Sequence, residues 1–108
     1  MAAPKLIPQV AREACDRLRQ LYGSRLQHVV LYGSCARGEA GEGSDIDLLV
    51  VLDDFEDVEA ELRRIAPIEN ELSLEHDVVV CSLVMRAEDY RRGASPLLMN
   101  VRREGIPL

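Results

Sequence analysis

The sequence predicts one small domain of mixed α and β structure (α/β or α+β), with helices flanking a small mixed sheet. The chain has 108 residues, 47% of them hydrophobic, so a single core can form without disulfide support. Short apolar, β-branched runs typical of buried strands are interleaved with segments of helical periodicity. The element order is helix, strand, strand, helix, strand, helix, without repeat or linker, so residues 1–108 are expected to form one domain.

The first part of the chain predicts a helix, a strand and a loop. Over residues 8–22 apolar residues recur every three or four positions, which indicates an amphipathic helix. Residues 28–32 (HVVLY) have the apolar, β-branched profile of a buried strand. Residues 33–44 contain four glycines and predict a loop, in which Ser34 is placed to cap a short helical turn.

The middle of the chain predicts the central strand. Residues 46–52 (IDLLVVL), opened by Asp45, are apolar at nearly every position, as expected of a strand buried on both faces. Residues 56–66 predict a helix with one apolar stripe, which Pro67 should break or restart. Residues 76–81 (HDVVVC) predict a third strand.

The last part of the chain is less regular. Residues 82–93 show no clean period and predict a loop or short helix. Ser95 and Pro96 are typical of a helix start, and the final helix should end near Gly105.

Composition excludes several classes of protein. Lys and Arg number 13 against 19 Asp and Glu, a formal net charge of -6, which argues against stable binding of nucleic acid through its phosphates. Only four aromatic residues and no Trp are present, so a base-stacking platform is not expected. The three cysteines form no ligand or redox motif, and no apolar run approaches the ~20 residues of a membrane span, so we expect a reduced, cytoplasmic chain.

Two carboxylates open the central strand. Side chains alternate along a strand, so Asp45 and Asp47 share one face, ~6.6 Å apart at their Cα atoms. No Lys or Arg occurs between residues 44 and 54, so a divalent cation is the natural counter-charge. Asp77 would bring a third carboxylate to this patch if its strand lies beside the second one. Alone, this pattern also fits a solvated strand edge.

A glycine and a serine directly follow the first predicted strand. Gly33 lacks a Cβ, so backbone N–H groups can approach a phosphate, and Ser34 adds a hydroxyl at a possible helix start. By itself this pair also fits an ordinary turn. Its combination with the two aspartates that follow after ten intervening residues is far more specific and indicates a phosphate site beside a metal site.

The run GSCARGEAGEGSDIDLLVVL resembles the signature of the minimal nucleotidyltransferases, the smallest members of the DNA polymerase β superfamily. The resemblance is close over residues 31–52, and the remaining element order fits the whole chain. It implies a polymerase β-like fold and transfer of a nucleoside monophosphate from a nucleoside triphosphate to an acceptor, with release of pyrophosphate.

The resemblance also implies the roles of individual residues. Catalysis and metal binding fall to three carboxylates, Asp45, Asp47 and Asp77, which would hold two Mg²⁺ ions with the bound nucleotide. The nucleotide site falls to four residues: Gly33, Ser34, Arg37 and Ser44. For Arg37, a structural salt bridge is an equal alternative.

Three classes of function follow from the resemblance. Minimal members are often antitoxins that adenylylate a tyrosine of a HEPN-type toxin, so ATP and such a toxin are the expected partners. The short, acidic chain favours this class. Transfer to RNA or a small molecule, and an antitoxin that acts by binding alone without catalysis, are the alternatives.

Overall fold

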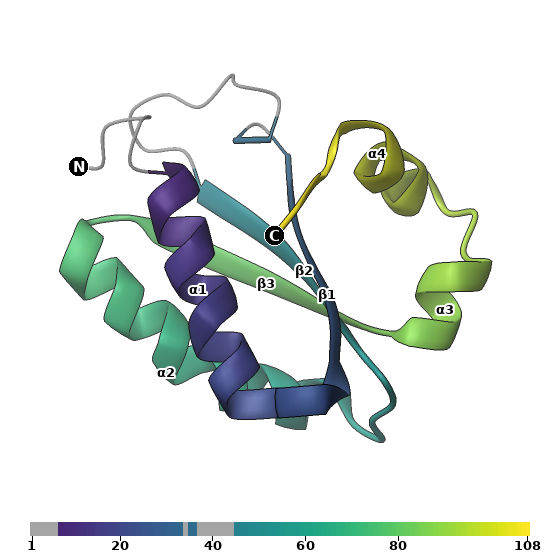
Figure 1. Cartoon of the computed structure of the whole chain (residues 1–108), viewed down its shortest axis with the longest axis horizontal. Helices are drawn as coiled ribbons and strands as arrows, with labels where there is room; N and C mark the ends of the chain where they lie inside the picture. Colours follow the sequence, from purple (N-terminus) through teal and green to yellow (C-terminus); the bar gives the residue numbers. More distant parts are fainter. Residues whose placement is uncertain (1–6, 34, 37–44) are drawn as a thin grey trace.

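A four-stranded mixed sheet forms the centre of the molecule (Figure 1). The computed structural model describes residues 7–33, 35–36 and 45–108. The strands are β1 (Leu26–Tyr32), β2 (Asp45–Leu52), β3 (Val79–Arg86) and β4 (Ile106–Pro107), in the order β3-β2-β1-β4. Strand β1 is antiparallel to β2 and β4, whereas β3 is parallel to β2. The predicted α+β class and mixed sheet are confirmed.

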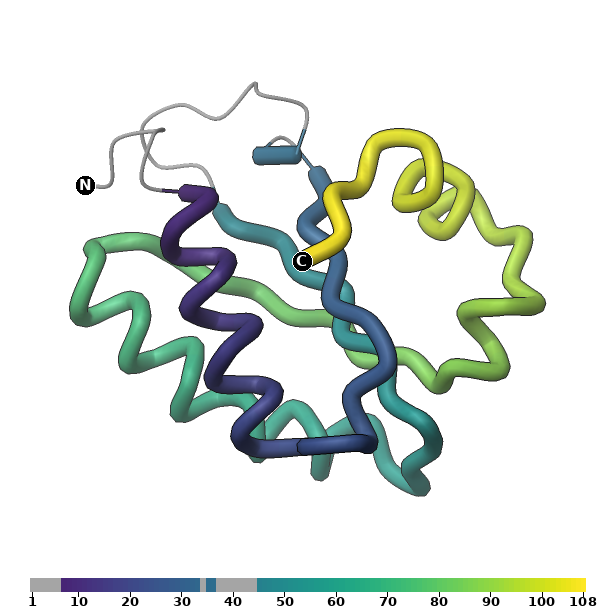
Figure 2. The backbone as a smooth tube through the Cα atoms, in the orientation of Figure 1, coloured from purple at the N-terminus to yellow at the C-terminus, as the bar shows by residue number. Residues whose placement is uncertain are grey.

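Helices cover both faces of this sheet. The helices are α1 (Ile7–Tyr22), α2 (Val58–His76), α3 (Ala87–Arg92) and α4 (Pro96–Glu104), with the 3₁₀ turn η2 (Gly23–Arg25) after α1. Helices α1 and α2 run side by side over one face, and α3 and α4 lie on the other (Figure 2). None of these helices combines the length and apolar character needed to span a membrane.

The alternation of β2 divides the core between the two faces. Ile46, Leu48 and Val50 are buried against α1 and α2. Leu49 and Val51 are buried on the opposite face, beneath α3 and α4. Burying each such side chain contributes about 1.5–3 kcal/mol, which fixes both the register and the direction of every β2 side chain.

Helix α2 continues through its proline. The prediction that Pro67 breaks or restarts the helix is wrong, because α2 is one helix from Val58 to His76. Pro67 and Arg63, whose carbonyl loses its hydrogen bond, are both exposed, so water can bind that carbonyl. Ile65 and Leu72, on either side of the proline, are buried and hold the helix to the core.

The third strand begins later than expected. His76 ends α2 and Asp77 is its C-cap, with φ 53° and ψ 49°, so the prediction of a strand over residues 76–81 is wrong at its start. The Asp77 N–H donates to the carbonyl of Ser73 at 2.9 Å. Aspartate tolerates this left-handed conformation better than most residues, which explains why the helix ends there.

The C-terminal elements are partly as predicted. Residues 82–93 were expected to form a loop or short helix: the short helix α3 is present from Ala87, but the residues before it are the end of β3, which continues to Arg86. The final helix is confirmed: the Ser95 side chain accepts a hydrogen bond from the N–H of Leu98, and Gly105 is the C-cap. Strand β4, only two residues long, pairs with β1 and was not predicted.

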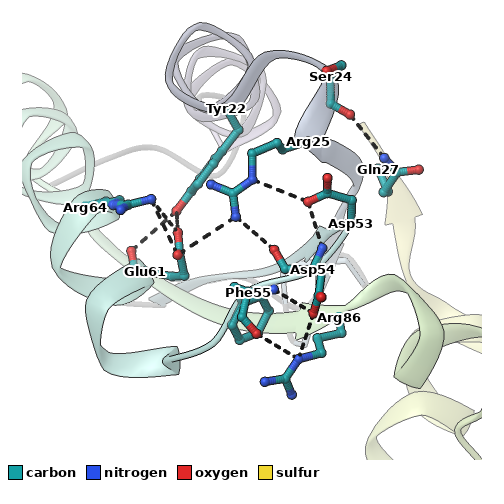
Figure 3. Close-up of polar contacts among 10 residues, drawn as sticks. All are labelled: Tyr22, Ser24, Arg25, Gln27, Asp53, Asp54, Phe55, Glu61, Arg64 and Arg86. Carbon is teal, nitrogen blue, oxygen red and sulfur yellow. Dashed lines mark hydrogen bonds and ion pairs between the residues drawn. The ribbon is translucent and has the colours of Figure 1, made fainter.

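A polar cluster joins the elements at the end of the sheet away from Asp45 (Figure 3). The Glu61 side chain of α2 is buried and accepts a hydrogen bond from the Tyr22 hydroxyl at 2.9 Å. Arg64 approaches Glu61 at 3.4 Å, and Arg25 pairs with Asp53 at 3.3 Å. These contacts fasten the end of α1 and the start of β1 to α2 and to the segment after β2.

Candidate active site

Asp45 and Asp47 lie on one face at the start of β2, as predicted. This is the face that carries Leu49 and Val51, but α3 and α4 cover only that later part of the strand. Asp45 is exposed and Asp47 half-buried. Burial, and then the charge of Asp45, raise the pKa of the Asp47 carboxyl.

The two carboxylates suit a hard divalent cation. Among the described residues, none forms an ion pair with Asp45 or Asp47, whereas most other acidic clusters of the molecule pair with arginine. Carboxylate oxygens without a cationic partner, in a partly buried and mutually repulsive pair, are the donor set that Mg²⁺ prefers. These two residues would hold the ion.

Gly33 packs directly against Asp47. It follows β1 and has φ 77°, a conformation that favours glycine. A Cβ at Gly33 would lie 2.6 Å from Oδ2 of Asp47, so no larger residue fits without moving the carboxylate. The turn continues with a hydrogen bond from the Ala36 N–H to the Gly33 carbonyl at 3.1 Å. The glycine therefore brings the backbone after β1 up to the carboxylate pair.

Cys35 links this turn to β2. Its buried thiol lies 3.1 Å from the carbonyl oxygen of Asp45, to which it donates a hydrogen bond.

The three remaining residues of the expected nucleotide site, Ser34, Arg37 and Ser44, lie outside the described residues.

Tyr32 and Cys81 flank Asp47 in the sheet. Tyr32 is its register partner on β1, and Cys81 its partner on β3. Burial raises the pKa of the Tyr32 hydroxyl, and the Asp47 and Cys81 charges add to this effect. Neither neighbour was predicted from the sequence, because the register between strands depends on long-range packing. Their only signal was that each lies in a predicted strand.

Asp77 is close to the site in the fold but is not a strand residue. It precedes Val79, the register partner of Asp45, by two positions and so lies at the same end of the sheet. The parallel register places Cys81, not Asp77, directly beside Asp47. The role of Asp77 as third carboxylate stays a prediction.

A second acidic cluster lies between α1 and α2. His76 Nε2 is 2.6 Å from Glu13 Oε2 and 3.8 Å from Glu75 Oε2. Arg17 contacts the same Glu75 at 3.1 Å and Glu71 at 3.3 Å. Because Arg17 already pairs with Glu75, and His76 contacts Glu13, the cluster is best explained as an ion-pair network that joins the two helices.

A groove of about 640 Å³ lies between α1 and β4. It is lined mainly by apolar side chains, including Ile7, Leu31 and Ile106. Leu31 faces α1, on the side of the sheet opposite Asp47. The groove is therefore separate from the carboxylate pair.

The sequence pattern of the nucleotidyltransferase domain family matches residues 11–95, a stretch that includes Gly33, Asp45, Asp47 and Asp77. The chain belongs to this nucleotidyltransferase family. The enzyme class and family expected from the residues around Gly33 and Asp45 are thereby confirmed.

One related sequence and two solved structures are similar to this nucleotidyltransferase. A Methanocaldococcus jannaschii protein named "Putative protein adenylyltransferase" is 33% identical over 82 residues, covering 75% of each chain. A solved structure described as "Structure of putative minimal nucleotidyltransferase" has 28% identity and a TM-score of 0.64, covering 100% of this chain and 97% of that one. One chain of a tri-AMPylated Shewanella oneidensis HEPN toxin in complex with an MNT antitoxin has 22% identity and a TM-score of 0.58, covering 94% and 70%. The predicted polymerase β-like nucleotidyltransferase fold is confirmed.

Proposed function

We propose that this nucleotidyltransferase transfers AMP from ATP to a hydroxyl group of a protein, namely a tyrosine of a HEPN-type toxin. The observation that carries the proposal is the carboxylate pair of Asp45 and Asp47 beside Gly33, on the half of the sheet that α3 and α4 leave open. The relative named as a protein adenylyltransferase and the complex of an MNT antitoxin with an AMPylated toxin support a protein acceptor. We place this reaction in the cytoplasm.

The reaction exchanges one phosphorus–oxygen bond for another. The acceptor oxygen attacks the α-phosphorus of ATP, the bond from that phosphorus to the bridging oxygen breaks, and pyrophosphate leaves with its electron pair. Bound Mg²⁺ would neutralise charge on the phosphates and make the acceptor hydroxyl more acidic.

The chain's own residues position these groups. Asp45 and Asp47 hold the cations, and Gly33 allows backbone N–H groups to approach the phosphates. We assign phosphate contacts to Ser34, Arg37 and Ser44, and we assign Asp77 to polarise the attacking hydroxyl at the same end of the sheet. The proton of the acceptor hydroxyl leaves toward the Asp77 carboxylate.

The two alternatives are transfer to RNA or a small molecule, and binding of the toxin without any transfer. RNA is disfavoured because a net charge of -6 repels phosphates. A small-molecule acceptor would be modified without any partner protein. An antitoxin acting by binding alone would not need Asp47, yet the carboxylate pair and Gly33 are all in place.

Transfer of labelled AMP tests the proposal. Purified chain is incubated with Mg²⁺, ATP labelled in the α-phosphate and a HEPN-type protein as the candidate acceptor. We expect label on a tyrosine of that protein, and none when Asp47→Asn replaces the wild type, because this variant keeps the shape of the side chain and removes its charge. Equal labelling by Asp47→Asn would contradict the assignment of Asp47.

A further inference from the structure

Strand β3 carries an exposed apolar row beside the carboxylates. By register, Val79, Cys81 and Leu83 pair with Asp45, Asp47 and Leu49 and share their face of the sheet. Val79 is 53% and Leu83 43% exposed, and Cys81 is exposed as well. We call these three residues the β3 row.

The row is unusual for an edge strand. Within the described residues, β3 ends the sheet and pairs only with β2. Proteins commonly protect such edges with lysine, proline or short strands. Strand β3 has eight residues and no charge before Arg86, so the unprotected edge and its apolar side chains indicate a surface that a partner covers.

The position of the row limits what can cover it. The opposite face of the sheet is occupied by α1 and α2, and α3 and α4 cover Leu49 and Val51. Anything that brings a hydroxyl to Asp47 from outside must therefore approach over the half of this face that the described helices leave uncovered, where Cys81 lies directly beside Asp47.

The charge around the row favours a basic partner. By register, Val79 lies directly beside Asp45 and Cys81 directly beside Asp47, so the row borders two carboxylates. No lysine or arginine lies on β3 before Arg86. An acidic patch with apolar contacts at its centre is complementary to a segment with apolar side chains flanked by lysine or arginine.

We propose that the acceptor protein docks on the β3 row, through a basic segment that packs its apolar side chains against Val79 and Leu83. This inference rests on the proposed function, because it assumes a protein acceptor. Docking there places the acceptor tyrosine next to the carboxylate pair, so the row determines which protein is modified. It does not determine whether ATP binds.

The test removes the apolar contacts of the row and adds a positive charge only at Leu83, which pairs with Leu49 and not with a carboxylate. The double variant Val79→Ser with Leu83→Lys is compared with Leu74→Lys, a control on α2 whose leucine is 87% exposed and lies away from this face. Three quantities are measured: the Kd for the HEPN-type protein by calorimetry, kcat/KM for AMP transfer to it, and the rise in Tm caused by Mg²⁺ and ATP.

We expect the double variant to raise the Kd and to lower kcat/KM, each by at least about tenfold. The rise in Tm caused by Mg²⁺ and ATP should be unchanged. The Leu74→Lys control should match the wild type in all three. If the lysine variant does not fold, Val79→Ser with Leu83→Ser removes the same apolar contacts and should give the same loss.

Other results would overturn the proposal. These are a Kd within twofold of wild type, loss of the rise in Tm, or a wild-type dimer that the double variant splits while toxin binding persists, because the row would then cover a second copy. Failure of the proposed function looks different: the wild type would bind the toxin without transferring AMP, and the Kd values would still decide the docking surface.

Discussion

Gly33 and Asp47 are in such close contact that a Cβ on the glycine would lie 2.6 Å from Oδ2 of the carboxylate. Gly33→Ala should therefore displace Asp47 as well as strain the backbone, whose φ is 77°. We expect a loss of stability of about 1–2 kcal/mol and loss of most AMP transfer. Thermal unfolding and the transfer assay measure the two effects separately.

Gly23→Ala is the matched control for that variant. Gly23 also has a positive φ, 58°, but nothing lies within 4 Å of its missing Cβ. It should lose comparable stability and keep wild-type transfer. If both variants lose transfer equally, backbone strain explains the effect and the contact with Asp47 does not matter.

The raised pKa of Asp47 predicts how stability depends on pH. Because the folded protein holds this proton more tightly than the unfolded chain, stability falls as the pH rises through the interval between the ordinary aspartate pKa and the folded value. Asp47→Asn removes this penalty. Without ligand it should melt above wild type at pH 7, and the difference should shrink as the pH falls toward 4. A variant that melts lower at pH 7 would show that the ionised carboxylate stabilises the fold.

Asp77 combines a helix-capping conformation with the predicted role of third carboxylate, and substitution separates the two. Asp77→Gly and Asp77→Asn both tolerate a φ of 53°, so both should keep the backbone conformation that ends α2. If Asp77 polarises the acceptor hydroxyl, both should lower kcat for AMP transfer by 10²-fold or more. Wild-type kcat in Asp77→Gly would reduce the role of Asp77 to that of a cap.

The site was predictable where its signals are local. The alternation of residues 46–52 fixes Asp45 and Asp47 on one face, and Gly33 follows its strand directly, so neither inference needs knowledge of distant contacts. The neighbours of Asp47 were not predictable from the sequence. A shift of β3 by two residues would satisfy the same alternation of faces and would place Asp77 beside Asp45 and Val79 beside Asp47. Only packing against α2 selects Cys81.

The two wrong predictions of secondary structure have the same origin. Pro67 is a strong local signal for a helix break, yet buried Ile65 and Leu72 keep α2 intact around it. The start of β3 was misplaced because residues 77–81 resemble a strand locally, whereas α2 continues to His76. In both places tertiary packing overrides local preference.

The buried carboxylate of Glu61 predicts a stability effect far from the site. Burial and its hydrogen bond with Glu61 raise the pKa of the Tyr22 hydroxyl (Figure 3). Glu61→Ala removes the carboxylate partner of that hydroxyl and leaves only the residue 61 carbonyl, at 3.5 Å, which should cost about 1–3 kcal/mol, or several degrees in Tm. Glu59→Ala is the control, since its pair with Arg63 is exposed and worth at most about 0.5 kcal/mol. An equal loss in both variants would contradict a special role for Glu61.

The central claim is that Asp45 and Asp47 form the metal and nucleotide site, and the rise in Tm on adding Mg²⁺ and ATP tests it most directly. A ligand that binds only the folded chain stabilises it by about 2.7 kcal/mol at a hundredfold excess over Kd, which for a domain of this size raises Tm by roughly 10–20 °C. We predict this rise for the wild type and none for Asp45→Asn with Asp47→Asn. An equal rise in the double variant would show that the nucleotide binds elsewhere and would contradict the account.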